Sequence, residues 1–173
     1  MDYSNFLGMR DELSLLVVIV LLFLYDTFGS VKSLKCFSAT ACVLLLAHTI
    51  FTIVPGEQVS LFGGMYQSGP ATSVIKTILN IGTLLVLIQA SSWIKNEDVI
   101  IRRGEYYVLT LITLLGMYLM TSSGNFLLFF LGLETASLPI TALVAMEKYK
   151  HDSHEAAAKY VFIAVFSSAL MLL

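Results

Sequence analysis

The chain has 173 residues, of which 57% are hydrophobic and only 13% are charged, with a formal net charge of −2. A soluble domain of this size carries about a quarter charged residues, so this chain has too little polar surface to coat a water-soluble globule. The composition therefore predicts an all-α polytopic membrane protein in contact with the lipid bilayer. The slightly negative charge excludes the basic surface with which most nucleic-acid-binding proteins contact phosphate groups.

The amino-terminal leader, MDYSNFLGMRDE, does not have the positive charge of a signal peptide, because three acidic residues surround Arg10. We therefore expect the first apolar run to remain in the mature protein as a membrane-spanning helix. Six runs in all have a length that can cross a hydrocarbon core of ~30 Å. They cover residues 13–28, 34–54, 74–94, 106–122, 124–146 and 155–173. The first and fourth runs are short, and their helices should begin earlier.

Two of the connections carry clear turn signals. Residues 55–72 include Gly63, Gly64, Gly69 and Pro70, which predict a hairpin-like loop on the membrane surface. Residues 121–125, TSSGN, form a turn short enough to make the fourth and fifth helices antiparallel neighbours.

Basic residues indicate the orientation of the chain. If the six spans alternate, loops 29–33, 95–105 and 147–154 share one side of the membrane. Their flanks contain most of the basic residues: Lys32, Lys35, Lys95, Arg102, Arg103, Lys148 and Lys150. Basic residues collect on the cytoplasmic side, so the amino terminus should face out. Lys76, just inside the start of the third span, is interpreted as an interfacial anchor.

Glu134 is the acidic residue that lies deepest in a predicted span. It lies ten residues beyond Gly124, about 15 Å along the axis, which is near the bilayer midplane. An ionisable group at this depth costs on the order of 2.5–3.5 kcal/mol, so its presence implies protonation or a nearby cation and water. Ser137 and Thr141 follow at i+3 and i+7 and extend a polar stripe that we expect to face other helices.

Pro139 lies one turn beyond Glu134 and cannot donate a hydrogen bond to the carbonyl of Thr135. We expect a helix kink there, with an acceptor free for water or a hydroxyl group. A wet kink beside a buried acid favours a role in handling protons. The alternative is a neutral glutamic acid that is hydrogen-bonded between helices for packing alone.

Two further residues are candidates for a proton path. Lys159 enters the sixth span by about one turn, but Glu155 at i−4 offers it an ordinary helical ion pair, and a lysine this shallow can snorkel. His48 lies in the second span and could relay a proton, although a lone membrane histidine is more often a packing residue. The sequence contains no typical metal, haem or phosphate motif. Three glycines should allow close helix contacts: Gly82, Gly116 and Gly132.

Residues 105–173 resemble the front part of the proton-translocating module in the antiporter-like membrane subunits of respiratory complex I. The matching pieces are GLE…SLP…ALVA in the fifth span and EAAAKY…SSALML in the sixth, in that order and spacing. The resemblance implies that Glu134 falls on the family's fifth-helix glutamate and Lys159 on the lysine at the head of the sixth helix. In the family, that glutamate modulates a lysine on the seventh helix.

The resemblance further implies that the chain is the amino-terminal part of a larger subunit of about fourteen helices. Residues 1–104 would then form three leading helices, and residues 105–173 the first half of the translocating module. Two departures from the family pattern are present: Thr135-Ala136 replaces a bulkier apolar pair, and His154 stands where an apolar residue is usual.

The expected function is proton translocation coupled to quinone reduction, as a membrane subunit of NADH–quinone oxidoreductase that is not catalytic alone. By this resemblance the chain binds no cofactor, and quinone, NADH, FMN and iron–sulfur clusters belong to other subunits. Its partners would be the other membrane subunits of the complex, in a bacterial plasma (inner) membrane. The alternatives are a subunit of a related cation/proton antiporter or membrane hydrogenase, and a truncated structural membrane component.

Overall fold

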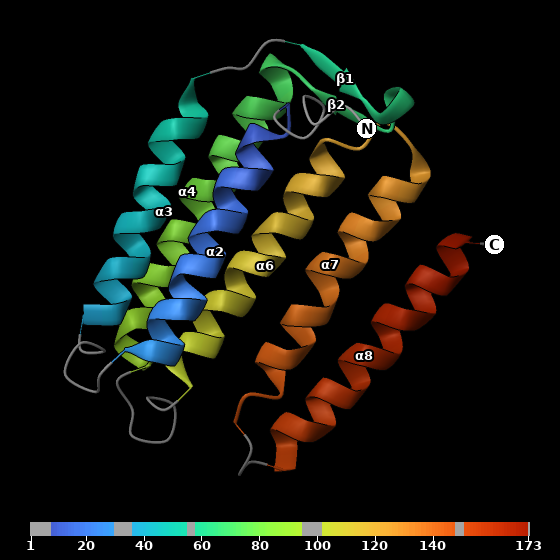
Figure 1. Cartoon of the computed structure of the whole chain (residues 1–173). Coiled ribbons are helices and arrows are strands. Elements are labelled where there is room, and N and C mark those ends of the chain that lie inside the picture. Colours follow the sequence, from blue (N-terminus) through green and yellow to red (C-terminus); the bar gives the residue numbers. More distant parts are fainter. Residues whose placement is uncertain (1–7, 30–35, 55–57, 95–101, 148–150, 173) are drawn as a thin grey trace.

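The computed structural model describes residues 8–29, 36–54, 58–94, 102–147 and 151–172. These residues form long helices that run alternately up and down, with a small hairpin at one end (Figure 1). The helices are α2 (Arg10–Phe28), α3 (Phe37–Ile53), α4 (Pro70–Trp93), α6 (Arg103–Thr121), α7 (Phe126–Val144) and α8 (His151–Leu172). The hairpin consists of β1 (Val59–Leu61), the 3-10 turn η2 (Phe62–Gly64) and β2 (Tyr66–Ser68).

Each predicted span coincides with one helix, so the predicted six-helix fold is confirmed. Four helices begin earlier than their apolar runs do, and for the fourth run this was expected, since α6 begins at Arg103. α2 begins at Arg10, as its short run led us to expect, and takes in the acidic residues of the leader. α4 begins at Pro70, because proline fits the first turn of a helix, where its missing N–H is not needed. α8 begins at His151 and takes in the polar segment ahead of the last apolar run.

Among the described residues, three helices are individually long and apolar enough to cross a membrane: Pro70–Trp93, Phe126–Val144 and Asp152–Leu172. α3 is equally apolar but has only 17 residues. α2 carries acidic side chains near both ends, and α6 is rich in tyrosine and threonine. All six helices nevertheless lie alongside one another (Figure 1), as expected for a polytopic membrane fold.

The core lies among α2, α3, α4 and α6, which we call the leading bundle. Inward-facing leucines at helical spacing fill it, and several are fully buried: Leu15, Leu22, Leu45, Leu87, Leu111 and Leu114. α7 packs against α6, and α8 packs against α7 at the outer side of the molecule (Figure 1). Apolar side chains on the outer faces remain exposed, as expected for helices that face lipid or other membrane helices.

Glycine allows α6 and α7 to approach closely. A Cβ atom added at Gly116 would lie 2.4 Å from the main-chain nitrogen of Ala136, and one at Gly132 would lie 2.8 Å from that of Met120. The prediction that these two glycines permit close contact is confirmed. The same prediction is wrong for Gly82, where an added Cβ would meet nothing within 4 Å. Gly82 lines an open, mainly apolar groove between α4 and α6.

The predicted hairpin is confirmed, and it is fastened to the turn between α6 and α7. Gly63 and Gly64 take positive φ angles of 66° and 89°, which glycine adopts without strain. The N–H of Gln67 donates to the carbonyl of Ser122 (2.8 Å), and the N–H of Gly124 donates to that of Met65 (2.7 Å). The hairpin therefore ties the leading bundle to the start of α7.

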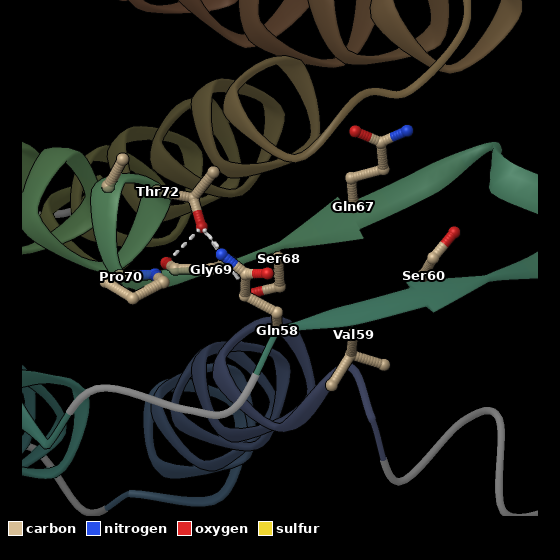
Figure 2. Close-up of a pocket in the computed structure, with 9 residues that line it drawn as sticks. Gln58, Val59, Ser60, Gln67, Ser68, Gly69, Pro70 and Thr72 are labelled. Carbon is tan, nitrogen blue, oxygen red and sulfur yellow. Dashed lines mark hydrogen bonds between the residues drawn. The ribbon is translucent and has the colours of Figure 1, made fainter.

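The hairpin ends directly at the first turn of α4. The Gly69 N–H donates to Thr72 Oγ1 (2.8 Å), and the same hydroxyl donates to the Gly69 carbonyl (2.7 Å), so Thr72 closes the helix start (Figure 2). An open cavity of about 510 Å³ lies beside this junction, between the hairpin and α4 (Figure 2). The junction sets the position of the following α4 turns, which carry buried polar side chains.

Candidate functional site

Ionisable side chains are buried together at the hairpin end of the leading bundle, in a group that we call the ionic cluster. It consists of Asp11 and Glu12 in the first turn of α2, Lys76 on α4, Tyr66 on β2 and Ser122 just after α6. The Lys76 side chain is 0% exposed, and its Nζ lies 2.7 Å from Glu12 Oε1. A lysine without access to water needs such a partner, because an unpaired buried charge is costly.

Glu12 has a partner for each oxygen of its carboxylate. The Tyr66 hydroxyl donates to Oε2 (2.8 Å), and Ser122 Oγ donates to Oε1 (3.2 Å) beside the lysine. Asp11 is bound less tightly: its Oδ2 lies 3.5 Å from Lys76 Nζ, and its Oδ1 lies 3.3 Å from Arg10 Nε but accepts no hydrogen bond. Two cations and two carboxylates therefore meet, and their formal charges cancel.

The burial of Lys76 corrects the interpretation of this residue as an interfacial anchor. Because α4 begins at Pro70, Lys76 lies more than one turn inside the helix, and its ammonium group reaches the first turn of α2. Burial, and then the negative charge of Glu12, raises the pKa of the Tyr66 phenol well above its usual range. Tyr66 is therefore a neutral donor to Glu12 at any physiological pH.

A second polar group, which we call the hydrogen-bond chain, crosses the leading bundle next to the ionic cluster. Ser14 Oγ lies 3.0 Å from His48 Nδ1, and His48 Nε2 lies 3.1 Å from the Tyr118 hydroxyl. Tyr118 donates to Asn80 Oδ1 (2.7 Å), and Asn80 Nδ2 donates to Thr52 Oγ1 (3.1 Å). His48 is 4% exposed, so the prediction that it is a satisfied interior residue fits its surroundings.

Tyr118 connects the two polar groups. Its hydroxyl belongs to the hydrogen-bond chain, and Lys76 Nζ lies 5.3 Å from the centroid of its ring. A cation over an aromatic face is attracted by the ring quadrupole. A change of charge at Lys76 or at His48 therefore changes the electrostatic environment of the same residue, Tyr118.

Glu134 lies in the middle of α7 and is partly buried, as its position in the sequence predicts. The two hydroxyl groups of the predicted stripe bond to main-chain oxygens: Ser137 Oγ donates to Glu134 O (3.3 Å), and Thr141 Oγ1 donates to Ser137 O (3.2 Å). Within the described part of the chain, no side chain bonds to the Glu134 carboxylate. Pro139 is buried inside α7 and has no N–H for the Thr135 carbonyl, and the kink itself stays a prediction.

Lys159 forms the helical ion pair that its sequence neighbours allow. Its Nζ lies 2.5 Å from Glu155 Oε1, and the two side chains are 70% and 52% exposed. Because α8 begins at His151, Lys159 lies about two turns into the helix and not one. The structure thus brings Lys159 to Glu155, and no described contact joins it to Glu134.

Sequence reasoning missed the ionic cluster and most of the hydrogen-bond chain, although a signal was present. Polar residues recur along α4 at i, i+3, i+7 and i+10, which places them on one helix face. They are Ser73, Lys76, Asn80 and Thr83, and all four are buried. Among the described residues, no three His, Cys, Asp or Glu side chains come close enough to hold a metal ion.

Comparison with known proteins places these features in a family. Residues 123–173 match the family model described as NADH:quinone oxidoreductase/Mrp antiporter, TM. NADH-quinone oxidoreductase subunit N of Phocaeicola vulgatus is 51% identical over 172 residues, which cover 99% of this chain and 36% of that protein. Subunit N of Azobacteroides pseudotrichonymphae is 45% identical over 177 residues, with the same two coverages.

A chain of respiratory complex I from Thermus thermophilus with bound aureothin has the same fold, with a TM-score of 0.72 at 23% identity. The match covers 94% of this chain and 34% of that one. The chain thus spans about a third of the length of the proteins that it matches. Identity over nearly its whole length shows that the chain belongs to the antiporter-like membrane subunits of NADH–quinone oxidoreductase, among the relatives of subunit N.

Proposed function

We propose that the chain contributes to proton translocation in a proton-pumping NADH–quinone oxidoreductase and has no redox centre of its own. The observation that supports this most strongly is its similarity to subunit N over nearly its whole length. NADH, FMN, iron–sulfur clusters and quinone would then bind to other subunits. The partners of this chain would be the other membrane subunits of the complex and the lipid bilayer. The residues that carry this role would be those that can gain and lose a proton inside the membrane.

Glu134 is the proton-carrying group in this proposal. It lies inside the segment that the family model matches, in the middle of an apolar helix and partly buried. Since no described side chain bonds to its carboxylate, the group is available to a cation or a water molecule supplied from outside the described part of the chain. Whether it carries a proton can then follow the charge of that partner.

The remaining predicted residues take secondary parts. Ser137 and Thr141 would offer hydroxyl oxygens to water along the same face of α7, and Pro139 would leave the Thr135 carbonyl open to that water. Lys159 would contribute less, because Glu155 already balances its charge. His48 lies on α3, in the hydrogen-bond chain, and its place on the route stays a prediction.

The arrangement in the membrane follows from the same proposal. The amino terminus and the hairpin would face out, because the flanks of the loops at the opposite end contain most of the basic residues. Residues 1–104 would form the leading helices and residues 105–173 the first half of the translocating module. The location would be the plasma membrane of a bacterium.

The replacement Glu134→Gln tests the proposal in the complete enzyme, reconstituted in proteoliposomes. Glutamine keeps the shape of the side chain but cannot ionise. We expect quinone reduction to continue while the ratio of protons moved to electrons transferred falls to about half or less. Glu105→Gln is the matched control, since it makes the same change at an exposed position in the first turn of α6, and it should leave the ratio unchanged. An unchanged ratio in Glu134→Gln would favour a purely structural subunit.

A second candidate is a cation/proton antiporter, because the family model that matches residues 123–173 covers Mrp antiporters as well. The two functions differ in what drives them. Proton movement that depends on quinone reduction supports the oxidoreductase. Sodium–proton exchange by the complete protein without any electron donor would support the antiporter instead.

A further inference from the structure

We propose that His48 is a proton-storing site in the leading bundle, open to proton exchange through Ser14 and closed at Asn80. The site goes beyond the proposed function, because it lies outside residues 123–173 and does not involve Glu134. It changes the predicted role of His48 from a relay to a store. The argument rests on the protons that each group of the hydrogen-bond chain has to give.

The direction of the hydrogen-bond chain is set at its closed end. Thr52 donates its hydroxyl proton to the main-chain oxygen of Thr49 (2.9 Å), so its oxygen accepts from Asn80 Nδ2. The other atom of that amide, Asn80 Oδ1, accepts the proton of the Tyr118 hydroxyl. Since a tyrosine has one hydroxyl proton, the Tyr118 oxygen can only accept from His48. A proton therefore resides on His48 Nε2.

The other end of the hydrogen-bond chain accommodates two protonation states. Ser14 Oγ lies 3.0 Å from His48 Nδ1 and also 3.0 Å from the main-chain oxygen of Asp11. When His48 is neutral, the serine proton points to Nδ1. When His48 is doubly protonated, Nδ1 donates to Ser14 and the serine proton turns to the Asp11 oxygen. Rotation of one O–H bond satisfies both states without moving a heavy atom.

The closed end prevents a stored proton from travelling further. To leave through Tyr118, the proton on Nε2 would have to move to the tyrosine oxygen, and the tyrosine proton would have to move to the amide oxygen of Asn80. A neutral amide is a very weak base, so this step does not occur. Tyr118 and Asn80 are both 0% exposed, whereas Ser14 is partly exposed, so protons enter and leave on the Ser14 side.

The ionic cluster lies close enough to bias the site electrostatically. Asp11 contributes both the carbonyl that receives the Ser14 proton and a negative charge that favours a positive imidazole. The positive charge of Lys76 opposes this effect of Asp11. The Lys76 ammonium group lies over the ring of Tyr118, which His48 contacts. The charged and titratable groups that act on His48 are Asp11 from α2, Lys76 from α4 and Tyr118 from α6. Arg10, Glu12 and Tyr66 act on it through their contacts with Asp11 and Lys76. Occupancy of the site is thus coupled to the charges of the cluster.

Solid-state NMR of the full chain in lipid bilayers, labelled with ¹⁵N-histidine, tests the proposal directly. The chain has three histidines, and His48→Gln identifies the signal of this one by removing it. We expect His48 to carry its proton on Nε2 at neutral pH. It should gain a second proton on Nδ1 as the pH is lowered from about 8 to about 4. The readout does not involve proton pumping, so its result is independent of the proposed function.

Two substitutions at Ser14 form a matched pair. Ser14→Thr keeps the hydroxyl group and should keep the acid-induced change. Ser14→Ala removes the acceptor for Nδ1, and we expect the ratio of doubly to singly protonated His48 to fall about tenfold at any acidic pH. A neutral His48 protonated on Nδ1, an absence of the second proton at the acid end, or equal uptake in Ser14→Ala and the parent would each overturn the proposal. The first two outcomes are measured on the unmodified chain, and His48→Gln serves only to assign the signal.

Discussion

The leading bundle and the pair α7–α8 treat ionisable side chains in opposite ways. Lys76 lies six residues beyond the start of α4, and Lys159 lies eight residues beyond the start of α8, so both are within the first two or three turns. Yet the Lys76 side chain is 0% exposed and binds Glu12, whereas that of Lys159 is 70% exposed and binds an acid of its own helix. Depth along a helix therefore does not determine whether a charge is buried. Lateral packing against neighbouring helices does.

The replacement Lys76→Met should have the largest effect on stability. Methionine fills a similar volume but leaves Asp11 and Glu12 buried without their shared cation. Breaking a buried ion pair in this way costs about 3–5 kcal/mol in free energy of unfolding. Reversible denaturation of the full chain in mixed micelles measures this loss in the free energy of unfolding. A loss below about 1 kcal/mol would mean that the cluster is open to water, and the contrast between the two regions would disappear.

Gly116→Ala should have the second-largest effect on stability, because it changes the α6–α7 contact that joins the two regions. The added methyl group would lie 2.4 Å from main-chain atoms of α7, and overpacking of this kind costs about 1–3 kcal/mol. Gly82→Ala is the matched control. Its methyl group meets nothing within 4 Å, so the better helix propensity of alanine should leave stability equal or slightly higher. The same denaturation measurement distinguishes the two variants, and equal losses would contradict the close α6–α7 contact.

Tyr66→Phe should have a smaller effect, since it removes one donor from Glu12 and leaves Lys76 and Ser122 in place. We expect a loss of about 1–2 kcal/mol near neutral pH. The raised pKa of Tyr66 means that folding opposes its ionisation, so the stability that this phenol adds declines as the pH rises above about 10. The difference between Tyr66→Phe and the parent should therefore shrink at alkaline pH. A constant difference would show that Tyr66 does not titrate in the unfolding reaction.

Lys159→Met should have the smallest effect. An exposed helical ion pair contributes about 0.2–0.5 kcal/mol, and the loss should decrease further at high salt. The loss of stability in Lys76→Met should be measured in the same buffers. It should depend much less on salt, because that ion pair is buried. A loss comparable with that of Lys76→Met would show that Lys159 has a partner outside the described residues.

Much of the fold could be predicted from the sequence, because each span is a local feature. Six apolar runs gave six helices, the glycines of residues 55–72 gave the hairpin, and the TSSGN turn gave antiparallel neighbours. Bounds were wrong where polar residues continue a helix beyond its apolar run, as at His151. The hydropathy of a segment does not reveal helical turns that consist of polar residues.

The ionic cluster could not be predicted by the same reasoning, because its members are far apart in the sequence. Glu12 and Lys76 are 64 residues apart, and Glu12 and Ser122 are 110 residues apart. Asp11 and Glu12 resemble an ordinary charged leader, and Lys76 resembles an ordinary interfacial lysine. Only the polar face of α4 indicated a buried site. Glu134 could be located from sequence because its apolar neighbours make it conspicuous, whereas the partner of its carboxylate could not.

The long separation between Glu12 and Lys76 has a consequence for biosynthesis. At about 5–20 residues per second, the ribosome needs about 3 to 13 s to make the 64 residues between the acid and its cation. For most of that time α2 is complete, but its two carboxylates have no lysine to neutralise them. Their position at the very start of α2 keeps them within reach of water until α4 arrives. Newly made chains should therefore pass through a stage in which the first helix is inserted but not yet docked.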